Sequence, residues 1–177
     1  MTDDLLDTLA AVHFAELPGA PAINARLAEA FEREKAADGV RRTHQFHGRF
    51  ENTYIDAGRL PELAPVSEFV VGTAQKLLGA TQLRHGFWFN EMHPGHRTTL
   101  HSHEELDELL SAVYYVSCPD DSGRLILHDD HALVTITPRP GLLVLFPPDL
   151  PHEVEENRSG ETRLSVAFNV GPPNSAT

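Results

Sequence analysis

Three histidines offer nitrogen ligands for a metal ion in a pattern that a fold could bring together. His101 and His103 are separated by one residue, and His152 follows the apolar run Leu142–Phe146 and a proline-rich turn. Alternate side chains of a β-strand point to the same face, so His101 and His103 can direct both imidazoles at one point. Imidazole binds iron, zinc, copper, nickel or manganese, and a third ligand completes a facial site. The pattern therefore predicts a metal centre at His101, His103 and His152.

A basic residue further along the chain could bind an anion beside this metal. Arg163 opens the last strand-like run, and Ser165 lies two residues beyond it on the same face. A guanidinium group can bind a carboxylate through two parallel hydrogen bonds. A metal with an anion anchor nearby suggests a chelating acid as cosubstrate.

Helical patterns occupy much of the chain ahead of these residues. Apolar residues recur at helical intervals from Ala22 to Ala36, and a second helix is predicted from Pro65 to Gly79. The second helix is expected to bury Val66, Phe69, Val70, Ala74, Leu77 and Leu78. The segment Val40–Ile55 has mixed periodicity, which indicates an irregular or partly extended chain.

The pattern changes after Gly79 to short apolar or alternating runs bounded by Pro, Gly or Asp. These runs predict strands at Leu83–Glu91, Thr98–His103, Ser111–Cys118, Arg124–His128, Leu133–Thr137, Leu142–Phe146 and Arg163–Val170. Their spacing is typical of an all-β sandwich or barrel. From about Gln82 onward we therefore predict a β core, with a helical layer ahead of it.

Composition limits the classes of function. The chain has 177 residues, of which 41% are hydrophobic, enough for one domain with a substantial core. A formal net charge of −12 disfavours nucleic acid and anionic membrane surfaces as partners. The single cysteine, Cys118, excludes an internal disulfide framework and fits a reducing cytosol. No apolar run approaches the length of a membrane span, so we expect a cytoplasmic protein, with a homodimer as a candidate oligomeric state.

The motifs of the second half of the chain match a known family in their order. They are Trp88–Asn90, Pro94-Gly95, His101–His103, Ser111–Tyr115, Ser122–Leu125, Pro140–Pro147, His152 and Arg163–Asn169. Together they resemble the Fe(II)/2-oxoglutarate-dependent oxygenases, closest to the small bacterial and phage branch with a His-x-His pair and a C-terminal Arg-x-Ser. The resemblance implies a mainly β double-stranded β-helix of the jelly-roll or cupin-like kind at residues 82–177. Residues 1–81 would form a helical support region of the same single domain, 1–177.

The resemblance also implies a metal and an activity. His101, His103 and His152 would hold Fe(II), and 2-oxoglutarate would complete the site as cosubstrate. The implied activity is that of a dioxygenase which hydroxylates an unactivated C–H bond of a small molecule or side chain. Succinate and CO2 would be released.

Further roles concern the cosubstrate. By the resemblance, Arg163 would bind the distal carboxylate of 2-oxoglutarate, and Ser165 and Tyr115 would be its hydrogen-bonding partners. Asn90 and His93 lie where the family tends to place polar groups that face the cosubstrate.

The second ligand position departs from the wider superfamily, which usually has a carboxylate there. Glu105 follows His103 by two residues, so a ligand set of His103, Glu105 and His152 stays open. We favour His101 and His103 because the gap from Gly95 to His101 matches the usual gap between the family's glycine and its first ligand.

A second class of protein fits part of the same pattern. The runs Gly95–Glu108 and Gly141–His152 are similar to the two motifs of the cupins, which include 2-oxoglutarate-independent dioxygenases, isomerases and non-catalytic binding modules. The pair Arg163-x-Ser165 favours the oxygenases, and the missing glycine after Glu108 counts against a cupin. A metal-binding module without turnover is the third alternative.

Overall fold

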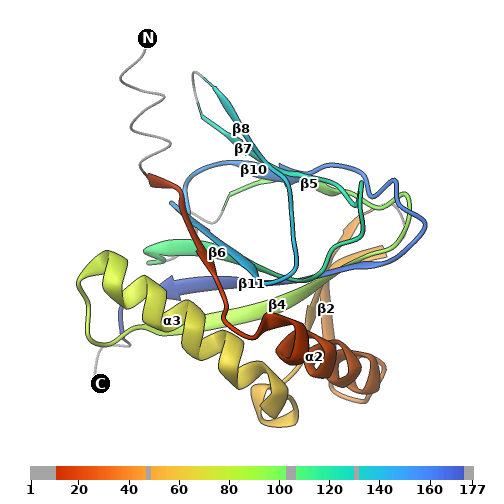
Figure 1. Ribbon diagram of the computed structural model, residues 1–177, viewed down its shortest axis with the longest axis horizontal. Coiled ribbons are helices and arrows are strands. Elements are labelled where there is room, and N and C mark those ends of the chain that lie inside the picture. The colour runs from red at the N-terminus through yellow and green to blue at the C-terminus, as the bar shows by residue number, and fades with distance from the viewer. Residues whose placement is uncertain (1–10, 47–48, 103–106, 130–131, 174–177) are drawn as a thin grey trace.

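The computed structural model describes residues 11–46, 49–102, 107–129 and 132–173 (Figure 1). Two antiparallel sheets face each other, and two helices cover the outer side of the larger sheet (Figure 1). This arrangement confirms the predicted fold class, a mainly β double-stranded β-helix with helices packed against it. Within the described residues, no helix is long and apolar enough to cross a membrane.

The larger sheet has seven strands in the described residues. Their order across the sheet is β1 (His13–Glu16), β9 (Leu142–Phe146), β6 (Leu110–Ser117), β11 (Arg163–Gly171), β4 (Arg84–Met92), β3 (Arg49–Tyr54) and β2 (Arg41–Phe46). Strand β11 lies in the middle and pairs with β4 along its whole length, from Arg163 opposite Met92 to Gly171 opposite Arg84. The strand that was predicted to carry the anion anchor is therefore flanked on both sides by other strands.

The smaller sheet has four strands in the described residues. Their order is β5 (Thr98–His101), β10 (His152–Val154), β7 (Leu125–His128) and β8 (Leu133–Ile136). Because β10 lies between β5 and β7, this sheet joins a C-terminal strand to strands from the middle of the chain.

Helices α2 (Ala20–Glu34) and α3 (Ala64–Leu78) carry a proline in their first turn, where a missing N–H costs nothing. Gly79 ends α3 in the left-handed conformation, with φ of 63°, which glycine adopts without strain. Two short 3-10 turns, η1 (Ala57–Arg59) and η2 (Pro61–Leu63), lead into α3. Both helices begin within two residues of the predicted starts.

The hydrophobic core has two parts, one on each side of the larger sheet. The part under the helices includes Leu27, Phe31, Val70 and Tyr114. The part between the sheets includes Tyr115, Leu125, Leu127, Ile136, Leu142, Val144 and Phe146. Every residue of β9 is buried because both faces of this strand are covered, which explains its unbroken apolar sequence.

The helix prediction was wrong about two side chains. Leu77 and Leu78 are 40% and 37% exposed, although we expected both to be buried. Helix α3 buries the stripe formed by Val66, Val70 and Ala74, and the last turn extends beyond it.

Three strands or hairpins were not predicted as such. The segment expected to be irregular or partly extended forms the β2–β3 hairpin, and β1 and β10 are additional strands. Strand β2 is mostly exposed and so lacks the alternation of apolar and polar residues that marks a half-buried strand. Strand β10 spans only three residues, too few to show any period.

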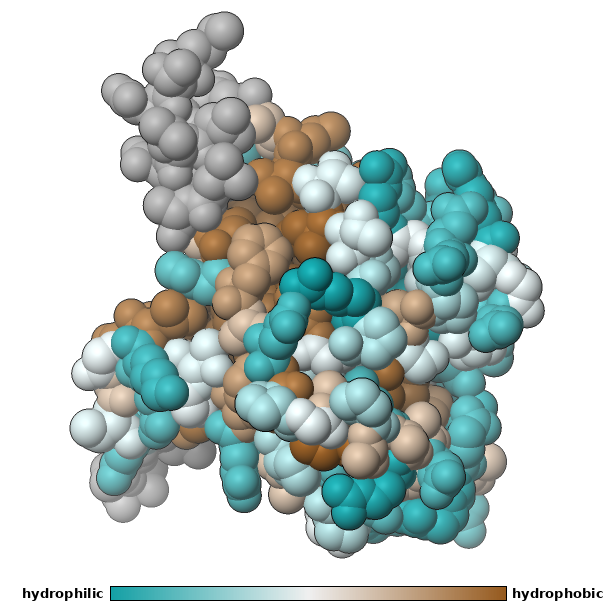
Figure 2. Space-filling view, in the orientation of Figure 1, coloured by the Kyte–Doolittle hydropathy of each residue, from teal (hydrophilic) through white to brown (hydrophobic). Residues whose placement is uncertain are grey.

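Hydrophobic side chains also reach the surface. Phe14 on β1 and Leu133 on β8 are 55% and 62% exposed. Figure 2 shows hydrophobic side chains gathered on the part of this face where β1 and the β7–β8 hairpin lie, while hydrophilic side chains cover its right-hand side. Such areas are common at contact surfaces, and the homodimer stays a prediction.

The turn before β7 should tolerate only glycine at position 123. Gly123 has φ of +91°, and a Cβ atom there would lie 2.2 Å from the carbonyl oxygen of Glu155. We expect Gly123→Ala to lower the free energy of unfolding by about 2–3 kcal/mol, measured by urea denaturation. Gly160→Ala is the control, because a Cβ at Gly160 meets no atom within 4 Å. Equal losses in both variants would contradict the explanation.

Candidate metal and cosubstrate site

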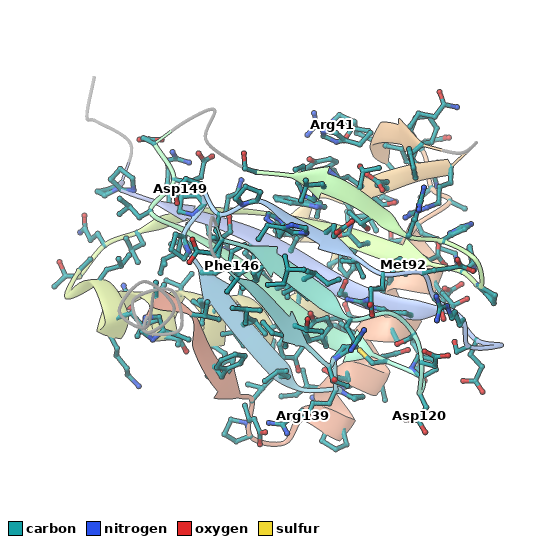
Figure 3. All side chains as sticks on the ribbon, turned by 90° about the horizontal axis from the view of Figure 1, so that it is seen from above. Arg41, Met92, Asp120, Arg139, Phe146 and Asp149 are labelled. Carbon is teal, nitrogen blue, oxygen red and sulfur yellow. The ribbon has the colours of Figure 1, made fainter. Side chains whose placement is uncertain are left out.

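A cavity of about 360 Å³ lies between the two sheets. The larger sheet contributes Trp88, Asn90, Met92, Tyr115, Phe146, Arg163 and Ser165, and the smaller sheet contributes His101, Leu125, His152 and Val154. Phe146 and Met92, labelled in Figure 3, lie on its wall. All but one of the predicted site residues within the described part of the chain, His93 being the exception, therefore line one cavity.

The pairing of β5 with β10 brings two predicted metal ligands together. His101 lies directly opposite His152 in the register of the two strands. Their ring centroids are 4.3 Å apart, with an angle of 55° between the rings. His152 is 7% exposed and also packs edge-on against Phe146, with centroids 4.8 Å apart. Two imidazoles from distant parts of the sequence thus meet at the wall of the cavity.

Backbone carbonyls define which nitrogen of each ring is protonated. His101 Nδ1 lies 2.7 Å from the carbonyl oxygen of Thr99, and His152 Nδ1 lies 2.9 Å from that of Leu150. A carbonyl oxygen only accepts hydrogen bonds, so each Nδ1 carries the proton and the lone pair of the neutral ring is on Nε2. Histidines that ligate metals usually donate their other N–H in this way.

A third ligand must come from elsewhere. The described residues contain no group of three His, Cys, Asp or Glu side chains that could hold a metal ion. His103, which both ligand sets of the sequence analysis contain, and Glu105, which only the alternative set contains, belong to residues 103–106 and lie outside the described residues. The donor set fits Fe(II) as far as it is described, because imidazole suits iron and both rings present the same nitrogen.

Arg163 is the most deeply buried charge of the cavity wall. Its side chain is 1% exposed, and Nη1 donates to the carbonyl oxygens of Ser122 at 3.3 Å and Gly123 at 2.8 Å. The guanidinium lies 5.1 Å from the centre of the Tyr115 ring. Its Nε has no hydrogen-bond partner among the described residues. A buried cation with an unsatisfied donor is costly unless an anion joins it.

Tyr115 presents a second buried donor beside Arg163. Its side chain is 0% exposed, and its hydroxyl has no hydrogen-bond partner in the described part of the chain. Burial raises the pKa of Tyr115 to about 12, against the opposing effect of the Arg163 charge. The phenol therefore stays protonated and able to donate at any pH near neutrality. Ser165, 3% exposed, lies opposite Tyr115 in the sheet.

This corner of the cavity fits the distal carboxylate of a dicarboxylic acid. A carboxylate accepts hydrogen bonds and carries a negative charge that would pair with the Arg163 guanidinium. It could accept from both Arg163 Nε and the Tyr115 hydroxyl, so both unsatisfied donors would gain a partner. The fit rests on the orphaned Arg163 Nε and Tyr115 hydroxyl, which sequence alone does not show.

Asn90 and His93 were expected to face the cosubstrate, but both have protein partners elsewhere. Asn90 lines the cavity, but its amide donates to the Glu51 carbonyl oxygen at 2.8 Å and to Asn52 Oδ1 at 3.1 Å, which ties β4 to β3. The His93 side chain is 50% exposed, and its Nδ1 lies 2.8 Å from Thr162 Oγ1. The structure does not bring His93 to the cavity wall.

The segment Val40–Ile55 adds wall residues that the sequence analysis did not name. Glu51 and Tyr54 on β3 line the cavity, and the Tyr54 ring lies 6.0 Å from that of Trp88. Arg41, on the other strand of the same hairpin, stacks over this Tyr54 ring, 4.1 Å from its centre. These residues belong to the segment predicted to be irregular or partly extended. Phe50 and Tyr54 have the spacing of one strand face, but the polar Asn52 between them breaks the apolar alternation that would have predicted a strand.

The Tyr115 hydroxyl offers a test of the anion corner. Tyr115→Phe should leave the free energy of unfolding unchanged or slightly higher, because the lost hydroxyl has no protein partner, but should weaken 2-oxoglutarate binding by roughly 5-fold. Tyr114→Phe should lower the free energy of unfolding and leave 2-oxoglutarate binding unchanged, since the Tyr114 hydroxyl donates to Asn24 Oδ1 at 2.6 Å outside this cavity. Urea denaturation and titration with 2-oxoglutarate would measure both. The reverse pattern would contradict the assignment.

Comparisons with known proteins bear on the class of this protein. A family model for 2OG-Fe(II) oxygenases matches residues 128–169, the segment that carries His152, Arg163 and Ser165. No curated protein matches the sequence. The family match supports the predicted enzyme class, an Fe(II)/2-oxoglutarate-dependent oxygenase, together with Fe(II) and 2-oxoglutarate as its cofactors.

Solved structures share the fold at low sequence identity. A prolyl-4-hydroxylase from Pseudomonas putida has a TM-score of 0.63 at 22% identity, covering 98% of this chain and 96% of that chain. A prolyl hydroxylase from Trichoplax adhaerens, solved with a hypoxia inducible factor peptide, has a TM-score of 0.73 at 13% identity, with 96% and 88% covered. A 2OG-Fe(II) oxygenase family oxidoreductase from Burkholderia pseudomallei has a TM-score of 0.66 at 18% identity, with 99% and 91% covered.

Proposed function

We propose that this protein is a dioxygenase that hydroxylates an unactivated C–H bond of a small molecule or an amino-acid side chain, with 2-oxoglutarate as cosubstrate. The observation that carries the proposal is a single cavity lined by the paired imidazoles of His101 and His152 and by the buried Arg163, whose Nε has no hydrogen-bond partner among the described residues. When bound, Fe(II) supplies the binding and activation of O2 and the oxidative decarboxylation that yields succinate and CO2.

The proposed ligands are His101, His103 and His152. The facing imidazoles of His101 and His152 support two of these positions. The alternative set of His103, Glu105 and His152 stays open, so the pairing of His101 with His103 is part of the proposal. Each carbonyl that accepts an Nδ1–H bond would hold its ring in the tautomer that ligation needs.

The cosubstrate corner is assigned to Arg163, Tyr115 and Ser165. Arg163 would pair with the distal carboxylate of 2-oxoglutarate, and Tyr115 would donate its hydroxyl proton to the same group. Ser165 adjoins both in the sheet. Asn90 would shape the wall, since its amide hydrogens already bind β3.

The remaining wall determines what can approach the iron. Leu125, Phe146 and Val154 are apolar residues of the cavity wall, and such a lining excludes water from a reactive centre. Tyr54 and Trp88 add an aromatic pair to the same wall. This wall would hold the carbon chain of a small molecule or of a side chain, and peptide binding in one similar structure supports the second choice. The single domain, cytoplasmic location and homodimer stay predictions.

Anaerobic titration tests the proposal directly. Metal-free protein would receive Fe(II) and then 2-oxoglutarate, while the visible charge-transfer band of an iron-chelated 2-oxo acid is recorded. We expect this band to appear and to saturate at one equivalent of 2-oxoglutarate. Iron binding without the band would favour a cupin-type enzyme that does not use 2-oxoglutarate. An absence of iron binding would refute the metal centre.

A further inference from the structure

A buried carboxylate connects the two sheets near the metal end of the cavity. Glu51 lies on β3 of the larger sheet, is 5% exposed and lines the cavity. Its carboxylate reaches β5 of the smaller sheet, whose strand partner in the described residues is β10. Carboxylates are rarely this buried unless they have defined partners, so its contacts indicate its role.

The contacts of Glu51 converge on one residue. Thr99 donates its backbone N–H to Glu51 Oε1 at 3.3 Å and its hydroxyl to Oε2 at 3.5 Å. Arg49 Nη2 lies 3.6 Å from Oε1 and so balances the buried charge. Arg49 is itself held, because the same Nη2 donates to the Arg97 carbonyl oxygen at 2.6 Å. Among the described strands, β5 lies at the edge of the smaller sheet, and Glu51 therefore accepts a backbone hydrogen bond from it that a neighbouring strand would accept inside a sheet.

Thr99 in turn orients a proposed metal ligand. The carbonyl oxygen of Thr99 accepts the Nδ1–H of His101 at 2.7 Å. The N–H and the carbonyl of Thr99 belong to the two peptide planes on either side of one Cα atom. When Glu51 fixes the N–H and the hydroxyl of this residue, it also restricts the direction of the carbonyl that receives the His101 proton.

We propose that Glu51 is a positioning residue for the metal centre: it holds Thr99 across the gap between the sheets and thereby fixes the ring of His101. The inference rests on the proposed function, since it assumes that His101 ligates iron. Partners of ligating histidines typically change metal affinity by 10–100-fold when they are removed. Glu51 contacts His101 only through Thr99, so its removal should change metal affinity by an amount at the lower end of that range.

Iron affinity is the property to measure, and the chain has a suitable reporter. Trp88 is the single tryptophan of the sequence and lines the same cavity. Quenching of its fluorescence by Fe(II) under anaerobic conditions would give the dissociation constant without turnover. Glu51→Ala should raise this constant about 10-fold. Glu51→Gln, which removes the charge and one acceptor oxygen, and Thr99→Val, which removes the hydroxyl contact, should each raise it about threefold.

A matched control separates this role from general stability. Glu91 on β4 forms an ion pair with Lys35 at 2.6 Å and does not line the cavity. Glu91→Gln removes the charge of a partly buried glutamate that is also ion-paired, and it should leave the Fe(II) dissociation constant unchanged. Thermal unfolding of all variants would identify any that do not fold. If Glu51→Ala does not fold, the two milder variants provide the answer.

The outcomes distinguish this inference from the proposed function. Graded loss of iron affinity in the Glu51 and Thr99 variants, with Glu91→Gln at the wild-type value, supports it. Wild-type iron affinity in folded Glu51→Ala, or in both milder variants, overturns the positioning role and leaves the oxygenase proposal intact. A wild-type protein that binds no Fe(II) overturns both proposals together.

Discussion

Replacement of Arg163 by glutamine is expected to weaken 2-oxoglutarate binding by more than about 100-fold, because a buried, charge-assisted pair would lose its cationic partner. The guanidinium is 1% exposed and has no carboxylate partner among the described residues, so the pair would form in a site shielded from water. The charge-transfer band at saturating Fe(II), followed during titration, gives the affinity. Arg163→Lys should recover only part of it, since an ammonium group cannot bind a carboxylate through two parallel bonds.

A second 2-oxo acid makes this test specific. 2-Oxobutanoate can chelate iron in the same way but lacks the distal carboxylate, so its affinity should be nearly equal in wild type and Arg163→Gln. Arg124→Gln is the matched control, because Arg124 forms an exposed ion pair with Glu155 at 2.6 Å. Equal losses for both acids would show that the variant damages the site as a whole, and unchanged 2-oxoglutarate affinity would remove Arg163 from it. Urea denaturation would show the cost of leaving the Ser122 and Gly123 carbonyls without their donor.

His152→Ala is expected to reduce Fe(II) affinity by more than 100-fold, since a facial site with two protein ligands holds iron poorly. Iron content after anaerobic loading and gel filtration would measure the loss. His128→Ala is the control from the adjacent strand, because its ring binds Glu153 at 2.8 Å and does not line the cavity. A full equivalent of iron in His152→Ala would exclude this residue as a ligand.

The same assay can decide the second ligand. If His101 and His103 are both ligands, His101→Ala should lose iron to the same extent as His152→Ala, and Glu105→Gln should retain it. If the alternative set is correct, Glu105→Gln should lose iron and His101→Ala should retain most of it. The positioning role of Glu51 would then be excluded as well.

Much of the fold was predictable from sequence where local pattern and tertiary environment agree. Strand β9 is buried on both faces, and its sequence is an unbroken apolar run. Helix α3 is buried on one face, and its sequence shows an apolar stripe at helical spacing. Strands β2 and β10 were missed for opposite reasons, because β2 is exposed on both faces and β10 is too short to show a period. Pairing across the chain stabilises both, and a single sequence does not encode that pairing locally.

The candidate site was predictable in its residue types and not in its geometry. Strand periodicity placed Arg163 and Ser165 on one face, and the proline turn placed His152 at the end of a strand. The register that sets His101 opposite His152 depends on β10 entering the smaller sheet, which no local pattern indicates. The same holds for Glu51, because its contact with Thr99 crosses between two sheets.

The central position of β11 has a consequence for the order of folding. This strand is the last one along the described chain, yet it joins β6 to β4, and β10 likewise joins β5 to β7. During synthesis, the earlier strands of both sheets would therefore wait for partners that leave the ribosome last. Such non-local pairing slows folding, because chain closure must precede any gain from contacts. Arg163 begins the strand that completes the larger sheet, so we expect cosubstrate binding to arise in the final step of folding rather than in any earlier intermediate.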